Sequence, residues 1–162
     1  MSTPAATDTV VRQQVRVAVP VDRAFAIFTE QFDKIKPREH NMLAVPIAES
    51  VFETHVGGRI YDRGEDGTIC AWARVLSFEP PHRFVISWDI TPRWQIETDP
   101  ERCSEVEVRF TADDAGTLVE LEHRYLDRHG DGWQAERDSV AGPGGWPIFL
   151  DRLMAAANQP KR

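Results

Sequence analysis

The segment EVEVRFTADDAGTLVELEHRY, residues 105–125, alternates apolar and polar side chains on both sides of one turn. Alternation with a period of two is typical of half-buried strands, and residues 113–116 have the composition of a turn. A four-residue turn pairs Ala112 with Thr117, which predicts an antiparallel hairpin with its apolar side chains on one face. The predicted cross-strand pairs are Phe110 with Val119, Val108 with Leu121, Val106 with His123, Arg109 with Glu120, and Glu105 with Arg124.

Upstream of this hairpin, the chain has the pattern of short strands joined by tight turns. The Gly57-Gly58 pair and the Glu65-Asp66-Gly67 stretch are typical turn sequences. Strands joined by such turns pair antiparallel, so the hairpin should belong to a larger antiparallel sheet. The predicted upstream strands span residues 47–54, 59–63, 68–78 and 83–90.

Near the start of the chain, the sequence predicts a strand followed by a helix. Residues 11–19 alternate as a strand that Pro20 ends, and residues 32–46 form a short helix or a loop. Between them, apolar residues recur at the spacing of one helix face. These residues are Val21, Phe25, Phe28 and Phe32.

The C-terminal region predicts the helix that covers the sheet. Residues 130–145 are polar and glycine-rich, with at most one short helix around residues 135–140. Residues 146–157 then carry an apolar stripe at helical spacing, and Pro147 suits a first helical turn. An antiparallel sheet with segregated helices is an α+β fold, in which this last helix packs on the apolar face of the curved sheet.

Composition limits the classes of partner. The 162 residues carry a formal net charge of -7, which argues against a general nucleic-acid binder and against docking on an anionic membrane. We expect much of this acidity on the solvated outer face of the 105–125 hairpin. No stretch approaches the roughly 18 apolar residues of a membrane span.

Cys70 and Cys103 predict free thiols in a reducing cytoplasm. The expected organisation is a disordered lead (1–9), one domain (10–157) and a tail (158–162).

Five motifs in order resemble the START-like helix-grip superfamily, and within it the bacterial branch related to the activator of heat-shock protein 90 ATPase. The resemblance covers about residues 10–157. It implies a curved antiparallel sheet of about six to seven strands wrapped around a long C-terminal helix, with two short helices after the first strand. The motifs are Pro20–Phe25, Phe52–Arg59, Val75–Arg83, Gly116–His123 and Gly144-Gly145-Trp146.

The resemblance also implies a cavity for an apolar ligand between the sheet and the C-terminal helix. Relatives often carry Trp-Trp-Pro after the first helix, and this chain has Lys34-Ile35-Lys36-Pro37 there, so the local rim of the cavity is not predicted. No catalytic residue is implied, because this branch shares none. We predict the ligand-binding residues to be Phe25, Phe28, Trp72, Trp88, Val119, His123, Tyr125, Trp146 and Leu150.

Several of these side chains have two readings. His123 and Tyr125 share the inward parity of their strand and could recognise a ligand oxygen or act as acid and base, although a core histidine is the simpler reading for catalysis. The indoles of Trp72, Trp88 and Trp146 suit a cavity wall but also ordinary core packing. Trp94 and Trp133 are expected in loops, at the entrance or over the ends of the sheet.

Two charged clusters carry weaker predictions. Glu53 and Arg59 flank a turn and form either a surface ion pair or, if they face inward, a site for a carboxylate. Asp127, His129 and Asp131 alternate on a glycine-flanked loop with no fourth ligand nearby, so we predict no metal site.

Three functions fit the sequence. We prefer a binding module for a small hydrophobic molecule, without a cofactor, acting as a monomer or homodimer in the cytoplasm. The alternatives are a cavity enzyme of the cyclase, hydrolase or isomerase type on a polyketide-like or lipid-like substrate, and a chaperone-linked interaction protein. The last is less favoured, because the fold is expected to begin near Val10, without the separate N-terminal domain of the eukaryotic activator.

Overall fold

Seven antiparallel strands form one sheet within residues 9–158, the part of the chain that this computed structural model describes. The sheet order is β1-β7-β6-β5-β4-β3-β2, so the first and last strands in the chain are neighbours. The predicted lead and tail lie outside the described residues, apart from Thr9 and Asn158. The strands are β1 (Val11–Val17), β2 (Ile47–Phe52), β3 (Arg59–Gly64), β4 (Ile69–Glu79), β5 (Arg83–Trp88), β6 (Ser104–Asp113) and β7 (Gly116–Arg124).

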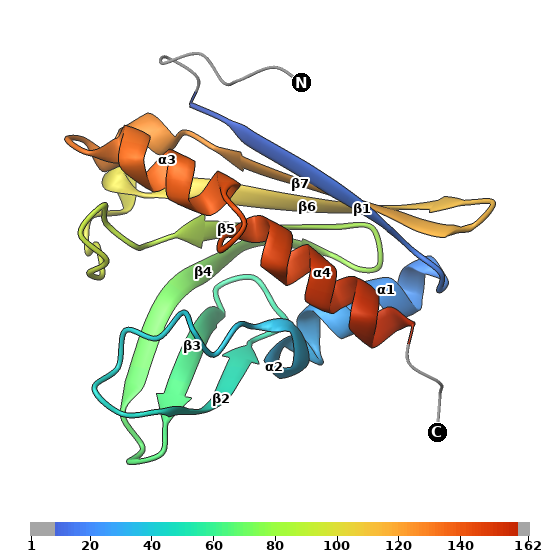
Figure 1. Cartoon of the computed structure of the whole chain (residues 1–162), viewed down its shortest axis with the longest axis horizontal. Coiled ribbons are helices and arrows are strands. Elements are labelled where there is room, and N and C mark those ends of the chain that lie inside the picture. Colours follow the sequence, from blue (N-terminus) through green and yellow to red (C-terminus); the bar gives the residue numbers. More distant parts are fainter. Residues whose placement is uncertain (1–8, 159–162) are drawn as a thin grey trace.

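The helices gather on one face of the curved sheet, with α4 lying across it (Figure 1). α4 packs against α1, α2 and β1, and the short connection 142–145 separates it from α3. The structure confirms the α+β helix-grip fold, including the two short helices after the first strand. The helices are α1 (Val21–Thr29), α2 (Phe32–Ile35), α3 (Trp133–Ala141) and α4 (Trp146–Ala157), with the 3₁₀ turns η1 (Pro100–Arg102) and η2 (Leu126–His129).

The β6–β7 hairpin has the predicted register. Phe110 pairs with Val119, Val106 pairs with His123, and the turn joins Asp113 to Gly116. The apolar side chains of the two strands are buried on the helix side, as the period of the pleat requires. A Cβ at Gly116 would lie 2.2 Å from the carbonyl oxygen of Val17, and the φ of Gly116 is +141°, so this position requires glycine.

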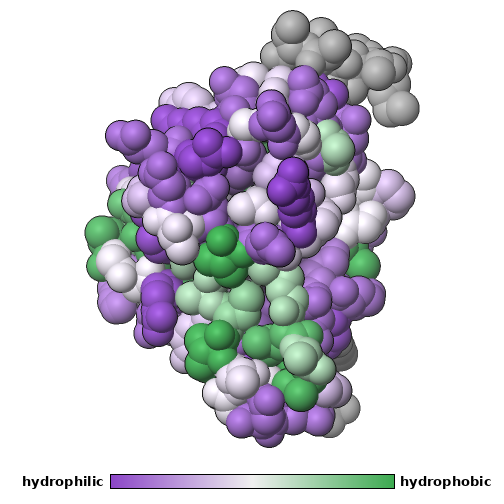
Figure 2. Space-filling model, turned by 90° about the vertical axis from the view of Figure 1, so that its left-hand side faces the viewer, coloured by the Kyte–Doolittle hydropathy of each residue, from purple (hydrophilic) through white to green (hydrophobic). Residues whose placement is uncertain are grey.

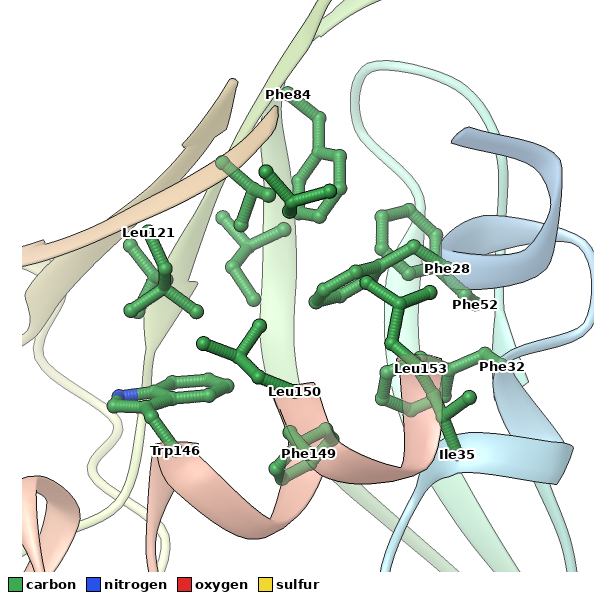
Figure 3. Close-up of a cluster of buried hydrophobic side chains, with 14 of the residues drawn as sticks. Phe28, Phe32, Ile35, Phe52, Phe84, Leu121, Trp146, Phe149, Leu150 and Leu153 are labelled. Carbon is green, nitrogen blue, oxygen red and sulfur yellow. The ribbon is translucent and has the colours of Figure 1, made fainter. Parts of the chain in front are cut away.

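Aromatic side chains dominate the core between α1, α4 and the sheet (Figure 3). Phe84, in β5, has no exposed surface. Its ring centroid is 5.2 Å from that of Phe28 and 5.1 Å from that of Phe52. From α4, Leu150 and Leu153 point into the same group. Burial of such large apolar side chains is the main favourable contribution to folding.

The outer face of the hairpin is less solvated than its composition suggests. Glu107, in β6, is 7% exposed and accepts hydrogen bonds from Arg83 and Arg124. Arg124 also donates to Glu105 and Glu122, so a network of arginines covers the acidic strands. Our expectation that these glutamates are freely solvated was therefore wrong for Glu107.

Replacing Glu107 by Gln is expected to lower the free energy of unfolding at pH 7 by about 1–3 kcal/mol. Burial raises the pKa of this carboxyl, but Arg83 and Arg124 outweigh burial and hold the pKa below its ordinary value. A carboxyl with a lowered folded-state pKa stabilises the protein above its unfolded pKa of about 4.3, and this contribution is lost as the pH falls through the folded value. Urea unfolding at pH 7 and about pH 3 measures the effect.

The difference between Glu107→Gln and the parent protein should shrink at the lower pH. Glu101→Gln, at an exposed position, is the matched control and should change stability little at either pH. An equal loss for Glu107→Gln at both pH values would contradict the electrostatic explanation.

Candidate functional site

A pocket of about 670 Å³ lies between the sheet and the start of α4. Its volume falls within the range of about 300–1,000 Å³ that is usual for small-molecule sites. β3, β4 and β5 form one side, the α2–β2 loop a second, and α3, α4 and their connection a third. The lining residues are Lys36, Glu39, His40, Asn41, Met42, Asp62, Trp72, Trp88, Ile90, Trp94, Asp138, Ser139, Val140, Gly142, Pro143, Gly144, Gly145, Trp146 and Phe149.

One wall of the pocket is a continuous row of aromatic rings. The ring centroids of Trp72 and Trp88 are 5.6 Å apart, those of Trp88 and Trp146 are 5.4 Å apart, and Phe149 lies 5.0 Å from Trp146. The tryptophan pairs meet edge to face, a favourable arrangement for indoles. This wall gives an occupant a large apolar surface contributed by two strands and one helix.

A buried ion pair provides a polar end to the pocket. Lys36 Nζ lies 3.1 Å from Asp62 Oδ2, and both side chains are 4% exposed. The ammonium also donates to the backbone oxygen of His40 at 2.8 Å, and Ser50 Oγ donates to Asp62 Oδ1 at 2.7 Å. Burial lowers the pKa of Lys36, although Asp62 opposes that shift. The pocket is therefore apolar along its wall and charged at this end.

The α2–β2 loop is tied to the C-terminal helices at the rim of the pocket. The His40 ring nitrogen Nε2 lies 2.5 Å from the Gly144 carbonyl oxygen, and Arg152 donates to Glu39 at 2.8 Å. A Cβ at Gly145 would lie 2.2 Å from the Val140 carbonyl oxygen, so only glycine permits this tight entry into α4. This contact explains Gly145, the second glycine of the pair that precedes Trp146.

Figure 2 shows the side of the molecule on which the α2–β2 loop lies, at the left of Figure 1. Hydrophobic side chains gather in the lower half of this face, and hydrophilic ones cover most of the upper half. The loop that supplies Met42 and His40 to the pocket is part of this side of the molecule.

Buried polar groups connect behind the aromatic wall. Trp146 Nε1 donates to His123 Nδ1 at 3.0 Å, and Ser104 Oγ lies 2.7 Å from both His123 Nε2 and His129 Nε2. All four side chains belong to residues that are 3% exposed or less. Burial lowers the pKa of His123 to about 3, so its imidazole is neutral at pH 7.

The connected polar groups continue from His129 to the carboxyl of Glu136, on α3. Trp88 Nε1 donates to Glu136 Oε2 at 2.9 Å, and Glu136 Oε1 lies 3.7 Å from His129 Nδ1. Burial raises the pKa of Glu136 to about 7. Ser104 and Glu136 are not among the residues predicted from the sequence, because their partners lie 19 to 48 residues away and no local pattern joins them.

Three of the nine predicted ligand-binding residues line the pocket, namely Trp72, Trp88 and Trp146. His123 lies behind the wall, bonded to Trp146. Tyr125 was expected to face inward, but it is 43% exposed, because its φ of +61° ends the alternation of β7. The structure places the other four residues in the packed core, away from the pocket lining, and these are Phe25, Phe28, Val119 and Leu150.

The remaining predicted positions lie as follows. Trp94 is in a loop and lines the pocket, whereas Trp133 begins α3, which corrects its expected loop position. Glu53 and Arg59 form an exposed pair at 3.9 Å. His129 points inward to Ser104, away from an exposed Asp127, and no group of metal-binding side chains occurs within residues 9–158.

Burial raises the pKa of the Cys103 thiol to about 12, so this cysteine is a poor nucleophile. The described region contains no helix with the length and apolar character needed to cross a membrane.

Solved structures share the fold over nearly the whole chain. An anthrahydroquino-γ-pyrone synthase, Txn09, complexed with SUM, is 37% identical, with a TM-score of 0.64 over 94% of this chain and 99% of that chain. CalC, a self-sacrificing resistance protein from Micromonospora echinospora, is 28% identical, with a TM-score of 0.65 over 93% and 95%. Protein NE0264 from Nitrosomonas europaea, 16% identical with a TM-score of 0.67 over 98% and 100%, shares the fold alone.

The family comparison covers most of the chain. None of the curated proteins compared with the sequence matches it. The family described as Activator of Hsp90 ATPase homolog 1-like protein matches residues 18–158, which include α1, all strands except β1, and α4. With its seven-stranded helix-grip fold within the described residues and these relatives, the chain belongs to the Activator of Hsp90 ATPase homolog 1-like family of the START-like superfamily.

Proposed function

We propose that the protein binds a small aromatic molecule that carries oxygen substituents, in the pocket between the sheet and α4. The observation that supports this most is the combination of an aromatic wall with a charged end. Trp72, Trp88 and Trp146 offer ring faces and edges to an apolar body, and Lys36 with Asp62 offers polar partners at one end. A purely aliphatic ligand would have no polar atom to place against this end of the pocket.

The size of the pocket and an unpaired donor agree with such a ligand. A volume of about 670 Å³ accommodates a molecule of three or four fused rings. The indole N–H of Trp72 is buried and has no hydrogen-bond partner among the described residues, so an oxygen acceptor on the ligand could satisfy it. The 37% identical synthase, named for an anthrahydroquino-γ-pyrone, supports a polycyclic polyketide as the ligand class.

Titration with 1,8-dihydroxyanthraquinone tests this proposal. We expect binding in the micromolar range or tighter, and Trp72→Ala should weaken it about tenfold or more, because one ring of the wall is lost. Quenching of tryptophan fluorescence and isothermal titration calorimetry measure the affinity. Trp133→Ala is the matched control, since Trp133 lies on α3 outside the pocket lining and should leave the affinity unchanged.

Palmitate serves as the aliphatic competitor in the same assay. Tighter binding of palmitate than of the anthraquinone would contradict the aromatic assignment. Equal affinity of the parent protein and Trp72→Ala would place the ligand elsewhere.

A second candidate is catalysis in the same pocket, of the polyketide-cyclase type. The similarity to a synthase supports it, and so does the buried amine of Lys36, whose lowered pKa suits proton transfer. Incubation with partly cyclised aromatic polyketides, followed by mass spectrometry, tests for turnover. Ring closure at the rate of the uncatalysed reaction would leave binding as the function.

We also propose a cytoplasmic location and a monomer or homodimer. The free cysteines Cys70 and Cys103 support a reducing compartment.

β1 and β2 form the two edges of the sheet, and an edge strand can pair with a second copy of the chain. Size-exclusion chromatography with light scattering distinguishes the two states.

A further inference from the structure

One arrangement of protons among the buried polar groups behind the wall gives the Ser104 hydroxyl both a donor and an acceptor. An indole N–H can only donate, so His123 Nδ1 accepts from Trp146 and the proton of the neutral imidazole is on Nε2. His123 therefore donates to Ser104 Oγ, and the Ser104 hydroxyl finds its acceptor in this group at His129 Nε2. His129 then carries its own proton on Nδ1. Every hydrogen bond in this chain points away from Trp146.

Both ends of the arrangement converge on Glu136. His129 Nδ1–H faces Glu136 Oε1 at 3.7 Å, and Trp88 donates to Oε2 from the other side. Neither His129 Nδ1 nor Glu136 Oε1 has a hydrogen-bond partner among the described residues. An ionised carboxylate only accepts, so it accepts the hydrogen bond from Trp88 and turns a negative oxygen toward the His129 N–H, whereas a proton on Oε1 would oppose that N–H. The other His129 tautomer would relieve this conflict, but it would leave the buried Ser104 hydroxyl proton without an acceptor in this group.

We propose that Glu136 is a positioning residue of the pocket wall, whose ionised carboxylate holds the Trp88 indole directly and the Trp146 indole through His129, Ser104 and His123. Protonation of Glu136 leaves one oxygen as an acceptor and sets an O–H donor against either His129 or Trp88, which loosens the wall and weakens ligand binding. This inference rests on the proposed function, because it names what controls the same pocket. Glu136 does not line the pocket and therefore acts through the two tryptophans.

Burial of the carboxyl places this titration near neutral pH. Burial raises the pKa of Glu136 to about 7, opposed by the hydrogen bond from Trp88. Burial lowers the pKa of His129 to about 4, so both imidazoles of the chain stay neutral where Glu136 titrates. Arg137, next to Glu136 on α3, lies over the Trp133 ring and donates to Asp138. The other charged groups near His129 are Asp89, after β5, Glu97, before η1, and Arg102, on η1.

The affinity for flavone, a neutral aromatic probe without a titratable group, tests the proposal between pH 6 and pH 8. With a pKa of about 7, about a tenth of the Glu136 carboxyls are ionised at pH 6, so the apparent Kd should rise about tenfold from pH 8 to pH 6. The tryptophan emission of the ligand-free protein should titrate with the same midpoint. This second measurement reports the environment of the tryptophans in the pocket wall when no ligand is bound.

Glu136→Gln should remove both pH dependences. The glutamine amide keeps the volume but places a donor against either His129 or Trp88, so the affinity at pH 8 should fall to about the value of the parent protein at pH 6. Asp151→Asn, an exposed carboxylate on α4, is the control and should keep the parent profile. If Glu136→Gln does not fold, Trp88→Phe still tests the proposal, because loss of the indole N–H should move the midpoint to higher pH.

The outcomes separate this inference from the proposed function. A parent protein that binds flavone with the same affinity at pH 6 and pH 8 overturns the inference and leaves the proposed function standing. A pH profile that Glu136→Gln or Trp88→Phe leaves unchanged also overturns it. Absence of flavone binding at every pH counts against the proposed function, while a tryptophan titration that Glu136→Gln abolishes still supports the positioning role.

Discussion

Replacing Lys36 by Met is expected to destabilise the protein by about 3–5 kcal/mol, because the change leaves the Asp62 carboxylate buried without its partner. The two side chains are each 4% exposed, and the ammonium also closes the loop through the His40 carbonyl oxygen. Methionine matches the length of the lysine stem but cannot donate to either group. Urea unfolding followed by circular dichroism measures the loss, which corresponds to a fall in Tm of roughly 10 °C or more.

The neighbouring α2 residue Lys34 provides the control. Lys34 is exposed, so Lys34→Met should change the free energy of unfolding by less than about 0.5 kcal/mol. The double variant Lys36→Met with Asp62→Leu should recover most of the lost stability, since no charge is then left buried. A Lys36→Met protein as stable as its parent would contradict the prediction that the buried Asp62 carboxylate needs the lysine as its partner.

Replacing Phe84 by Ala is expected to cost about 3–5 kcal/mol through the cavity it leaves. The ring has no exposed surface and contacts the rings of Phe28, Phe52 and Phe110 within about 6 Å. Thermal unfolding of the variant measures the loss. Because Phe84 lies in the closed core and does not line the pocket, the affinity of the folded variant for 1,8-dihydroxyanthraquinone should remain within about twofold of the parent value.

Two further substitutions calibrate this result. Phe84→Leu retains most of the volume and should cost clearly less than Phe84→Ala. Ile69→Ala, at a position 47% exposed, should change stability by no more than about 0.5 kcal/mol. A large loss of ligand affinity in the folded Phe84→Ala protein would mean that the core and the pocket are one connected space.

The register of the β6–β7 hairpin was predictable because a strand has a period of two. A shift by one residue would turn Val108 and Leu121 to the opposite face, so the sequence permits one pairing only. Tyr125 shows where this reasoning ends. Its side chain leaves the inward face because the backbone takes a left-handed conformation just after β7, and periodicity carries no information about a single backbone angle.

The pocket could be predicted only in part. The parity of the strands and the helical spacing identified Trp72, Trp88 and Trp146 as inward residues. The same patterns also select Phe28 and Leu150, which lie in the packed core. Periodicity shows that a side chain points inward, but it does not show whether that side chain meets other side chains or lines a pocket. The α2–β2 loop and Lys36 form one side of the pocket, and this stretch of the sequence has no clear periodicity. The position of a loop depends on distant contacts such as His40 with Gly144.

The pairing of β1 with β7 has a consequence for the order in which the protein folds. Arg12 and Glu122 are cross-strand partners 110 residues apart, whereas the β6–β7 hairpin closes over a four-residue turn. A local hairpin forms in microseconds, but a contact of such sequence separation must first overcome a large loop-closure entropy. During synthesis on the ribosome, at about 5–20 residues per second, β1 emerges first and stays unpaired for several seconds until β7 follows. The first strand to be made is thus among the last to find its partner.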